Sequence, residues 1–441
     1  MNWSGDLNIS ERFGAGASRL WWVVLGLLLA QMVSCAIWVH TWRGEERDFF
    51  AFYSGGRMGL SGQNPYDVAG MAKEQKQYHE RAGRTGDPDM VFFFSPPEAL
   101  VVFAPFSKLS WKYACYAWLS LQTSLALGLA CLAWTFGGDG RPRWIGPALA
   151  CACLLNPLTY RFLALGQCSL IVASVIALGQ WAFEARRPVL GSFLWGLAGI
   201  KPQLAIPFLA LAFVLGGWRR LAGVVAVIGV LNVLGCLITT GTPQTLLKYV
   251  RFVTENHLME RNRVERDQIS SWNHVVYVLG GPAWDLTATG MIASNAGWFF
   301  LIWLRHGCPL ISTWVPEYAL AAAAVGSVFC SLSHGYDLVI LALMAPLLIT
   351  RFKLGQRREV ASLAGLIAIT TIPRAVVKTS ASFLALRPGL VELALSYRSL
   401  IVAILAAYLI VRGQGGIRPS GGPKLHDTLP SVVDLSLGGS S

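Results

Sequence analysis

Residues Arg219–Thr240 have the sequence RRLAGVVAVIGVLNVLGCLITT, in which two arginines precede 20 residues without a charge. An apolar run of this length is sufficient for a helix to cross the hydrocarbon core of a bilayer. The bias extends over the whole chain of 441 residues, which is 54% hydrophobic and 14% charged, with a mean hydropathy of +0.50. Soluble domains carry about 25% charged residues. The sequence therefore predicts an all-α integral membrane protein.

Apolar runs separated by charged turns predict about 12 membrane-spanning helices, within a range of roughly 10–13. Together they form a transmembrane domain over residues 19–411. The expected spans are residues 20–41, 111–136, 144–160, 169–183, 189–200, 204–217, 221–240, 289–304, 314–332, 338–350, 360–377 and 390–411. A break is expected at Lys201-Pro202, since proline interrupts the helical hydrogen bonding. Two long loops, about residues 42–110 and 241–285, would carry short helices beside the membrane.

The basic turns predict the orientation of the bundle. They fall on alternate connections between the expected spans, at residues 141–143, 186–187, 219–220, 305 and 351–358. Because cytoplasmic loops accumulate Lys and Arg, we expect these turns and the amino-terminal residues 1–18 to be cytoplasmic. The Gly- and Pro-rich residues 412–441 are expected to form a disordered cytoplasmic tail. Both long loops would then face the outer side, and the first apolar run would be an uncleaved anchor.

Several other classes of function have little support in the composition. The net charge of +12 is explained by the basic cytoplasmic turns, and no nucleic-acid-binding motif accompanies it. The nine cysteines lie almost entirely in apolar segments, which favours packing over disulfides or zinc. Asp87-Pro88-Asp89 matches a loose Asp-x-Asp metal pattern, but two acids around a proline arise easily by chance. The sequence therefore predicts neither a metal nor another cofactor.

Two acids and a histidine are expected at the outer face. Asp48 follows the first span among aromatic residues, and poor solvation of its charge would make it a stronger base for a hydroxyl proton. His334 and Asp337 are close enough in sequence to share one helix face, and histidine carries protons near neutral pH. The alternative for the first is an acid at a helix end, paired with Arg47 or Arg57. The alternative for the second is a histidine that caps a helix.

Lys201 interrupts an apolar stretch and is followed by Pro202. A lysine at the centre of a spanning helix costs about 2.5–3.5 kcal/mol, so such residues usually face a polar cavity. A bound anionic phosphate would explain it, and the alternative is a side chain that extends to the membrane interface. Further cations that could bind a phosphate near outer span ends are Arg161, Arg374, Lys378 and Arg398.

A series of short motifs adds a resemblance to a known family. They are, in order, Asp48–Tyr53 (DFFAFY), Gly62–Asp67 (GQNPYD), Phe94–Pro97 (FSPP) with Pro105, Asn156-Pro157, Gly166-Gln167, Gly199–Pro202 (GIKP), Trp218–Arg220 (WRR) and Ser333–Leu338 (SHGYDL). In order and spacing, the chain resembles the integral-membrane glycosyltransferases of family 87, which are polyprenol-phosphate-mannose-dependent α-mannosyltransferase-like proteins with a GT-C fold. The resemblance covers about residues 45–345. Ser95 and Ser270–His274 depart from the family pattern, and the second departure lies in the loop expected to shape the acceptor site.

The resemblance implies a role for each candidate residue. Asp48 would be the general base on the acceptor hydroxyl, His334 would orient the acceptor or share the proton transfer, and Asp337 would support it. The residues expected to bind the donor phosphate are Lys201, Arg374 and Lys378. Those expected to line the substrate pocket are Tyr53, Asn64, Tyr66 and Gln167. The donor would be a polyprenyl-phosphate sugar, and neither a nucleotide nor a metal would be required.

The sequence thus predicts a membrane glycosyltransferase of the GT-C type in a bacterial inner membrane, with its active site at the periplasmic face. It would transfer a hexose, with mannose favoured, to a glycolipid or polysaccharide acceptor and would invert the anomeric carbon. One alternative is a flippase or transporter of lipid-linked sugars, although only one broken helix is evident and no counterpart is found in a second half. Another is a polysaccharide polymerase or ligase, for which residues 251–266 offer some basic groups in an outer loop.

Overall fold

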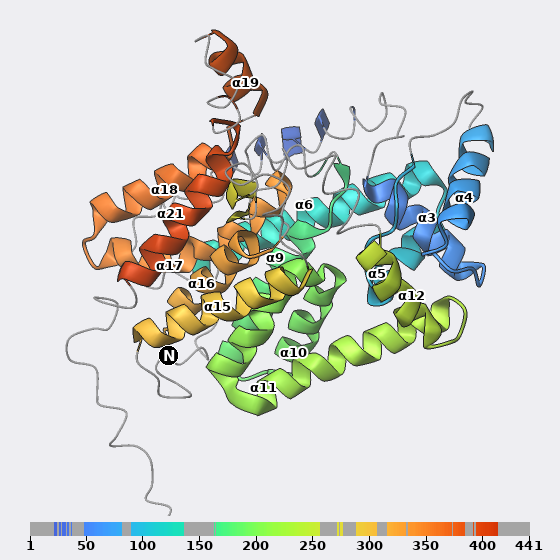
Figure 1. Cartoon of the computed structure of the whole chain (residues 1–441), viewed down its shortest axis with the longest axis horizontal. Helices are drawn as coiled ribbons and strands as arrows, with labels where there is room; N and C mark the ends of the chain where they lie inside the picture. Colours follow the sequence, from blue (N-terminus) through green and yellow to red (C-terminus); the bar gives the residue numbers. More distant parts are fainter. Residues whose placement is uncertain are drawn as a thin grey trace, which may run out of the picture.

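The computed structural model describes residues 48–81, 90–135, 163–255, 271–276, 288–306 and 315–412, and a few positions within 22–37. Within these ranges, residues 164, 273, 332, 333, 373, 384–390, 392 and 393 are omitted. All regular elements of this part are helices (Figure 1), which confirms the predicted all-α class. Outside the described residues lie most of the first expected span, the span at 144–160, Arg47, Asp87–Asp89, Arg161 and the two terminal segments.

The helices follow one another with short connections. Their bounds are α3 Asp48–Leu60, α4 Val68–Arg81, α5 Glu98–Ser107, α6 Trp111–Thr135, α9 Ser169–Glu184, α10 Pro188–Leu197, η1 Ala198–Ile200, α11 Pro202–Ile238, α12 Gln244–Phe252, α15 Ala288–His306, α16 Pro316–Phe329, η5 Gly335–Met344, α17 Ala345–Lys353, α18 Arg357–Thr370, α19 Arg374–Phe383 and α21 Tyr397–Arg412. Here η1 and η5 are 3-10 helices. Proline stands at the first position of α10, α11 and α16, where its fixed φ favours a helix and its missing N–H removes no hydrogen bond.

The longest helix contains two of the expected spans. α11 has 37 residues and, in the part of the chain that the structure describes, is the helix long and apolar enough to cross a membrane. Its direction changes at Gly217, whose φ of 62° and ψ of −163° are not helical. This bend lies between the expected spans 204–217 and 221–240 and is visible in Figure 1. The predicted break at Lys201 is confirmed, because η1 ends at Ile200 and α11 begins at Pro202. The total number of spans stays a prediction.

The first long loop contains three helices, as its proline-rich pattern predicts. α3, α4 and α5 lie together at one end of the molecule, next to α12 (Figure 1). α3 and α5 approach closely, because a Cβ on Gly56 would lie 2.1 Å from the Ser107 hydroxyl oxygen. Across this contact the rings of Phe52 and Phe103 stack with centroids 4.3 Å apart. Their packing fixes the direction in which α3 begins, at Asp48.

One expected span begins in an unexpected way. The sequence predicts a span at residues 338–350, whereas the structure has the ten-residue 3-10 helix η5 followed by α17. The interior of η5 is buried, and it packs against α9 and α16. Because a 3-10 helix rises about 2.0 Å per residue instead of 1.5 Å, this segment is thinner and longer than an α-helix. It begins at the predicted His334 and Asp337 pair, which it carries into the core.

Candidate active site

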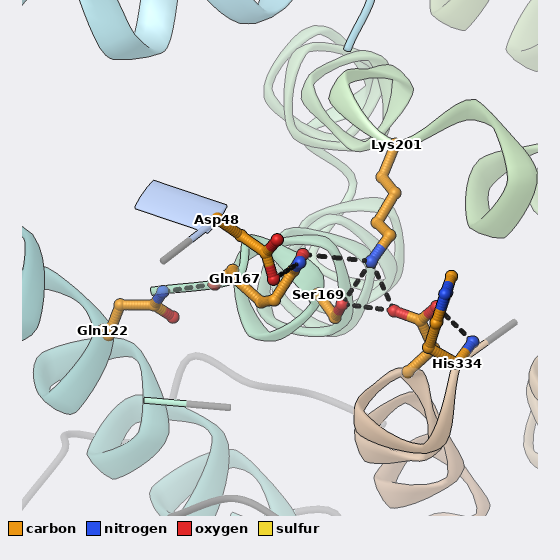
Figure 2. Close-up of polar contacts among 7 residues, drawn as sticks. Asp48, Gln122, Gln167, Ser169, Lys201 and His334 are labelled. Carbon is orange, nitrogen blue, oxygen red and sulfur yellow. Dashed lines mark hydrogen bonds and ion pairs between the residues drawn. The ribbon is translucent and has the colours of Figure 1, made fainter. Parts of the chain in front are cut away.

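Four segments that are distant in sequence bring polar side chains together inside the bundle. Asp48 begins α3, Gln167 and Ser169 lie at the start of α9, Lys201 lies between η1 and α11, and Asp337 lies in the first turn of η5. Figure 2 shows these side chains pointing toward one another from their separate helices. Four of the five are residues that the sequence predicts for the site; the serine is not.

A buried ion pair forms one half of this cluster. The Lys201 ammonium contacts the Asp337 carboxylate, and the two side chains are 8% and 0% exposed. The Ser169 hydroxyl lies 2.8 Å from Lys201 Nζ and donates to Asp337 Oδ1 at 2.5 Å. Removing two charges from water costs several kcal/mol for each ion, and a partner with good geometry and added hydrogen bonds offsets this cost. Lys201 therefore lies in a polar pocket of the protein interior, in line with the polar-cavity interpretation.

Gln167 connects this ion pair to Asp48. Its amide oxygen accepts a hydrogen bond from Lys201 Nζ at 3.4 Å, and its amide nitrogen donates to the Asp48 carboxylate. Its own backbone carbonyl accepts a hydrogen bond from the Gln122 side chain, which is 1% exposed. A continuous path of hydrogen bonds thus runs from Asp48 through Gln167 to Lys201 and Asp337 (Figure 2).

The backbone before Gln167 adopts a conformation that suits only glycine. Gly166 has a φ of 73°, and a Cβ at this position would lie 2.5 Å from Cβ of Phe49. The Trp118 indole N–H donates to its carbonyl oxygen at 2.9 Å, and the same indole stacks on Phe49 with ring centroids 5.1 Å apart. The motif Gly166-Gln167 therefore allows close contact with α3, and this contact places the amide of Gln167 beside Asp48.

Replacing Gly166 with alanine is expected to lower any activity that depends on Asp48. The new Cβ would be strained at a positive φ, at a cost of about 1–3 kcal/mol, and would push α3 away from Gln167. The matched control is Gly128→Ala in α6, where nothing lies within 4 Å of a new Cβ and alanine favours the helix. Thermal unfolding and activity should both distinguish the two variants. Equal behaviour would mean that the close contact between Gly166 and Phe49 does not matter.

His334 and Asp337 form the start of η5. The Asp337 carboxylate accepts a hydrogen bond from the His334 backbone N–H at 3.0 Å, and the Asp337 N–H donates to the His334 carbonyl at 2.8 Å. His334 therefore has a capping position, as its alternative interpretation proposed, and its half-buried ring also lies beside the polar cluster (Figure 2). Asp337 is fully buried and contacts Lys201, Ser169 and the His334 backbone. It is placed to support His334.

Three predicted pocket residues lie in an aromatic region next to the cluster. Tyr53 and Tyr66 are 1% and 5% exposed, and their hydroxyls donate to the carbonyl oxygens of Leu109 and Ser95, each at 2.9 Å. Asn64 accepts a hydrogen bond from the Tyr66 N–H at 3.3 Å. These contacts hold the loop after α3. A direct contact of any of the three with substrate stays a prediction.

The remaining predicted cations lie elsewhere. Lys378 is exposed on α19, which stands apart from the site in Figure 1, and Arg374 begins the same helix. Arg398 donates to the carbonyl oxygens of Thr370 and Ile372, so its contacts are those of a helix end. Arg57, the alternative partner of Asp48, instead contacts Glu74 at 2.7 Å. Of the predicted phosphate-binding cations, Lys201 is the one that the described residues place in the cluster.

Sequence reasoning missed Ser169 and Gln122. Both are buried polar residues in otherwise apolar helices, and a single serine or glutamine in such a run carries no distinguishing pattern. The signal for Ser169 is its position two residues after Gln167. Among the described residues, no group of three or more His, Cys, Asp or Glu side chains is arranged to hold a metal ion.

The comparisons with known proteins agree with the resemblance noted in the sequence. The sequence model of glycosyltransferase family 87 matches residues 93–330, which is more than half of the chain. The matched region contains Gln167, Ser169 and Lys201, and it ends shortly before His334. No curated protein and no solved structure has significant similarity to this chain.

Proposed function

The chain belongs to glycosyltransferase family 87, and from this premise we propose that it transfers a hexose, with mannose favoured, from a polyprenyl-phosphate sugar to an acceptor hydroxyl at the outer face of a bacterial inner membrane. Family membership supports glycosyltransferase activity. The finer statement is supported by the cluster itself, in which a half-buried carboxylate is linked through one amide to a buried cation. The chain thus has a base for a hydroxyl and a positive charge for a phosphate in one connected network.

In the proposed reaction, the acceptor hydroxyl oxygen attacks the anomeric carbon of the donor. The bond from this carbon to the phosphate oxygen breaks, and polyprenyl phosphate leaves with the electron pair. The hydroxyl proton passes to the Asp48 carboxylate, which acts as general base. Attack from the face opposite the leaving group inverts the configuration. Gln167 donates to Asp48 and so holds the carboxylate in a fixed orientation.

The leaving phosphate gains negative charge, and a fixed cation would stabilise it. Lys201 has three N–H groups and three acceptors in Gln167, Ser169 and Asp337. A phosphate oxygen that bound Lys201 directly would therefore displace one of them, and the contact with Gln167 is the longest at 3.4 Å. Such an exchange would couple donor binding to the position of Gln167 and of Asp48. His334 would orient the acceptor or share in the proton transfer, and Arg374 and Lys378 would contact the donor phosphate.

The proposal is tested by sugar transfer from purified protein in detergent. Radiolabelled polyprenyl-phosphate mannose and an extract of membrane glycolipids are supplied, with EDTA present and without any nucleotide sugar. We expect labelled mannose in the glycolipid fraction. A parallel reaction with a nucleoside-diphosphate mannose as the only donor should give none. Transfer from the nucleotide sugar alone, or loss of transfer with EDTA, would contradict the proposed donor chemistry.

The same assay separates the alternative functions. Donor binding without transfer to any extract would favour a flippase or transporter of lipid-linked sugars. Products that grow to long chains would favour a polysaccharide polymerase or ligase. Products with one added sugar, released with inverted configuration, are the expected result. Repeating the assay with other polyprenyl-phosphate sugars would establish whether mannose is preferred.

A further inference from the structure

Glu98 is a buried carboxylic acid that the proposed reaction does not use. It begins α5 after Ser95-Pro96-Pro97 and is 1% exposed. With ten residues, α5 is too short to span a bilayer, so Glu98 belongs to the helices of the first long loop. Buried glutamates are rare unless they are paired. Among the described residues, its Oε2 accepts one hydrogen bond and its Oε1 has no hydrogen-bond partner.

The Glu98 side chain lies directly against the segment that carries Lys201. A Cβ on Gly199 in η1 would lie 2.1 Å from Oε1 of Glu98, so glycine is required for the carboxyl group to fit. Gly199 is two residues before Lys201. The Asn232 amide in α11 donates to Oε2 at 2.8 Å, and also to the Ile228 carbonyl at 2.9 Å. Glu98 therefore connects the turn before Lys201 to the distal half of α11.

A second close approach fixes the backbone around Glu98. A Cβ on Gly235 of α11 would lie 1.9 Å from the carbonyl oxygen of Pro97. The proline turn is thus seated on α11 at one glycine, while the carboxyl group is seated on η1 at another. With its backbone held by α11, the Glu98 side chain has little freedom to move away from Gly199. A change in its hydration would instead have to move the turn.

The charged groups around Glu98 do little to stabilise an ionised carboxylate. The titratable side chains that interact with it are the phenols of Tyr66 and Tyr249, which are neutral near pH 7. On the elements packed against α5, Arg57 contacts Glu74, and the Lys201 ammonium contacts Asp337. Lys108 and Lys112 lie beyond the other end of α5, and Arg219 and Arg220 lie at the Gly217 bend. Burial accordingly raises the pKa of the Glu98 carboxyl to about 8.

We propose that Glu98, in its neutral acid form, is a positioning residue that holds the η1–Lys201 turn in the geometry that binds the donor. Ionisation would place a charge against the backbone of Gly199 with a single hydrogen bond to it. The charge would draw water to this contact, and the turn and Lys201 would shift. The inference rests on the proposed function in one respect, namely that Lys201 belongs to the donor site.

The first test measures thermal unfolding against pH for the wild type and Glu98→Gln in detergent. A folded-state pKa raised above the unfolded value, about 4.3, adds stability below that value and loses it progressively as the pH rises to about 8. The wild-type Tm should therefore fall between about pH 5 and pH 8 relative to the variant, whose amide does not titrate. Parallel curves would overturn the proposed neutral acid. This test needs no sugar transfer, so it stands even if the proposed function fails.

The second test measures sugar transfer at varied pH. The wild-type KM for polyprenyl-phosphate mannose should rise above about pH 8, by up to tenfold for each pH unit, while kcat changes less. In Glu98→Gln the KM should remain constant over this range. The control Glu74→Gln, which alters another carboxyl group of the same loop, should keep the wild-type profile. A rise in KM that persists in Glu98→Gln would contradict the positioning role.

The contact itself is tested by a pair of variants. Gly199→Ala should raise the donor KM, because its new Cβ overlaps the Glu98 carboxyl group. Adding Glu98→Ala removes the overlapping atoms and should return the KM part of the way toward the wild-type value. Independent effects of the two substitutions would mean that Glu98 does not act through Gly199. If the wild type transfers no sugar at all, the proposed function fails, and the Tm profiles still decide whether Glu98 is held neutral.

Discussion

Replacing Asp48 with asparagine is expected to lower kcat for sugar transfer by about 10²–10⁴-fold, the usual contribution of a general base. The amide cannot accept the hydroxyl proton at neutral pH. Its oxygen can still accept the hydrogen bond from Gln167, so the start of α3 should keep its position. The donor KM should therefore change little, since the phosphate-binding cation remains in place. Steady-state kinetics at varied donor concentration separate the two effects.

Two further variants make this result specific. Glu74→Gln removes a carboxylate that contacts Arg57 of the same helix, α3, and should leave kcat near the wild-type value. Asp48→Glu keeps a carboxylate but displaces it by one methylene group, and should retain part of the activity. An unchanged kcat in Asp48→Asn would remove Asp48 from the base role. A lower Tm for Asp48→Asn than for Glu74→Gln would indicate a structural contribution as well.

Most residues of the cluster could be predicted one at a time, because each departs from its local pattern. Asp48 is an acid beside a span, Lys201 is a cation within an apolar stretch, and His334 with Asp337 stands at a span end. Their mutual contacts could not be predicted. Gln167 and Asp48 are separated by 119 positions, and Lys201 and Asp337 by 136. Contacts over such separations depend on how helices pack, and periodicity within one segment carries no information about them.

The fold has a similar division between what is local and what is not. The break at Lys201-Pro202 follows from the chemistry of proline and is found where the sequence places it. The 3-10 form of η5 is different, since its apolar residues would suit an α-helix equally well. Its conformation is imposed by α9 and α16, against which it packs. Similarly, Tyr53 and Tyr66 carry hydroxyls that could face a substrate, but tertiary packing gives those hydroxyls backbone carbonyl partners.

The buried ion pair gives the second large effect, on stability and on transfer together. Lys201→Met leaves the Asp337 charge without its cation in the interior, at an expected cost of about 3–5 kcal/mol in the free energy of unfolding. Sugar transfer should be lost as well. Adding Asp337→Asn removes the stranded charge. The new amide can accept from the His334 N–H and donate to the Ser169 hydroxyl, so the double variant should recover much of the lost stability.

The double variant should nevertheless transfer no sugar, because it has no cation to stabilise the leaving phosphate. The matched control is Arg351→Met, which breaks another buried ion pair, with Glu359 at 2.7 Å, in α17 and α18. It should lower the Tm while the folded protein keeps its donor KM. Recovery of transfer in Lys201→Met with Asp337→Asn would mean that the charge of Lys201 serves only the fold. Failure to recover stability would mean that the loss in Lys201→Met comes from packing of the lysine chain and not from a stranded carboxylate.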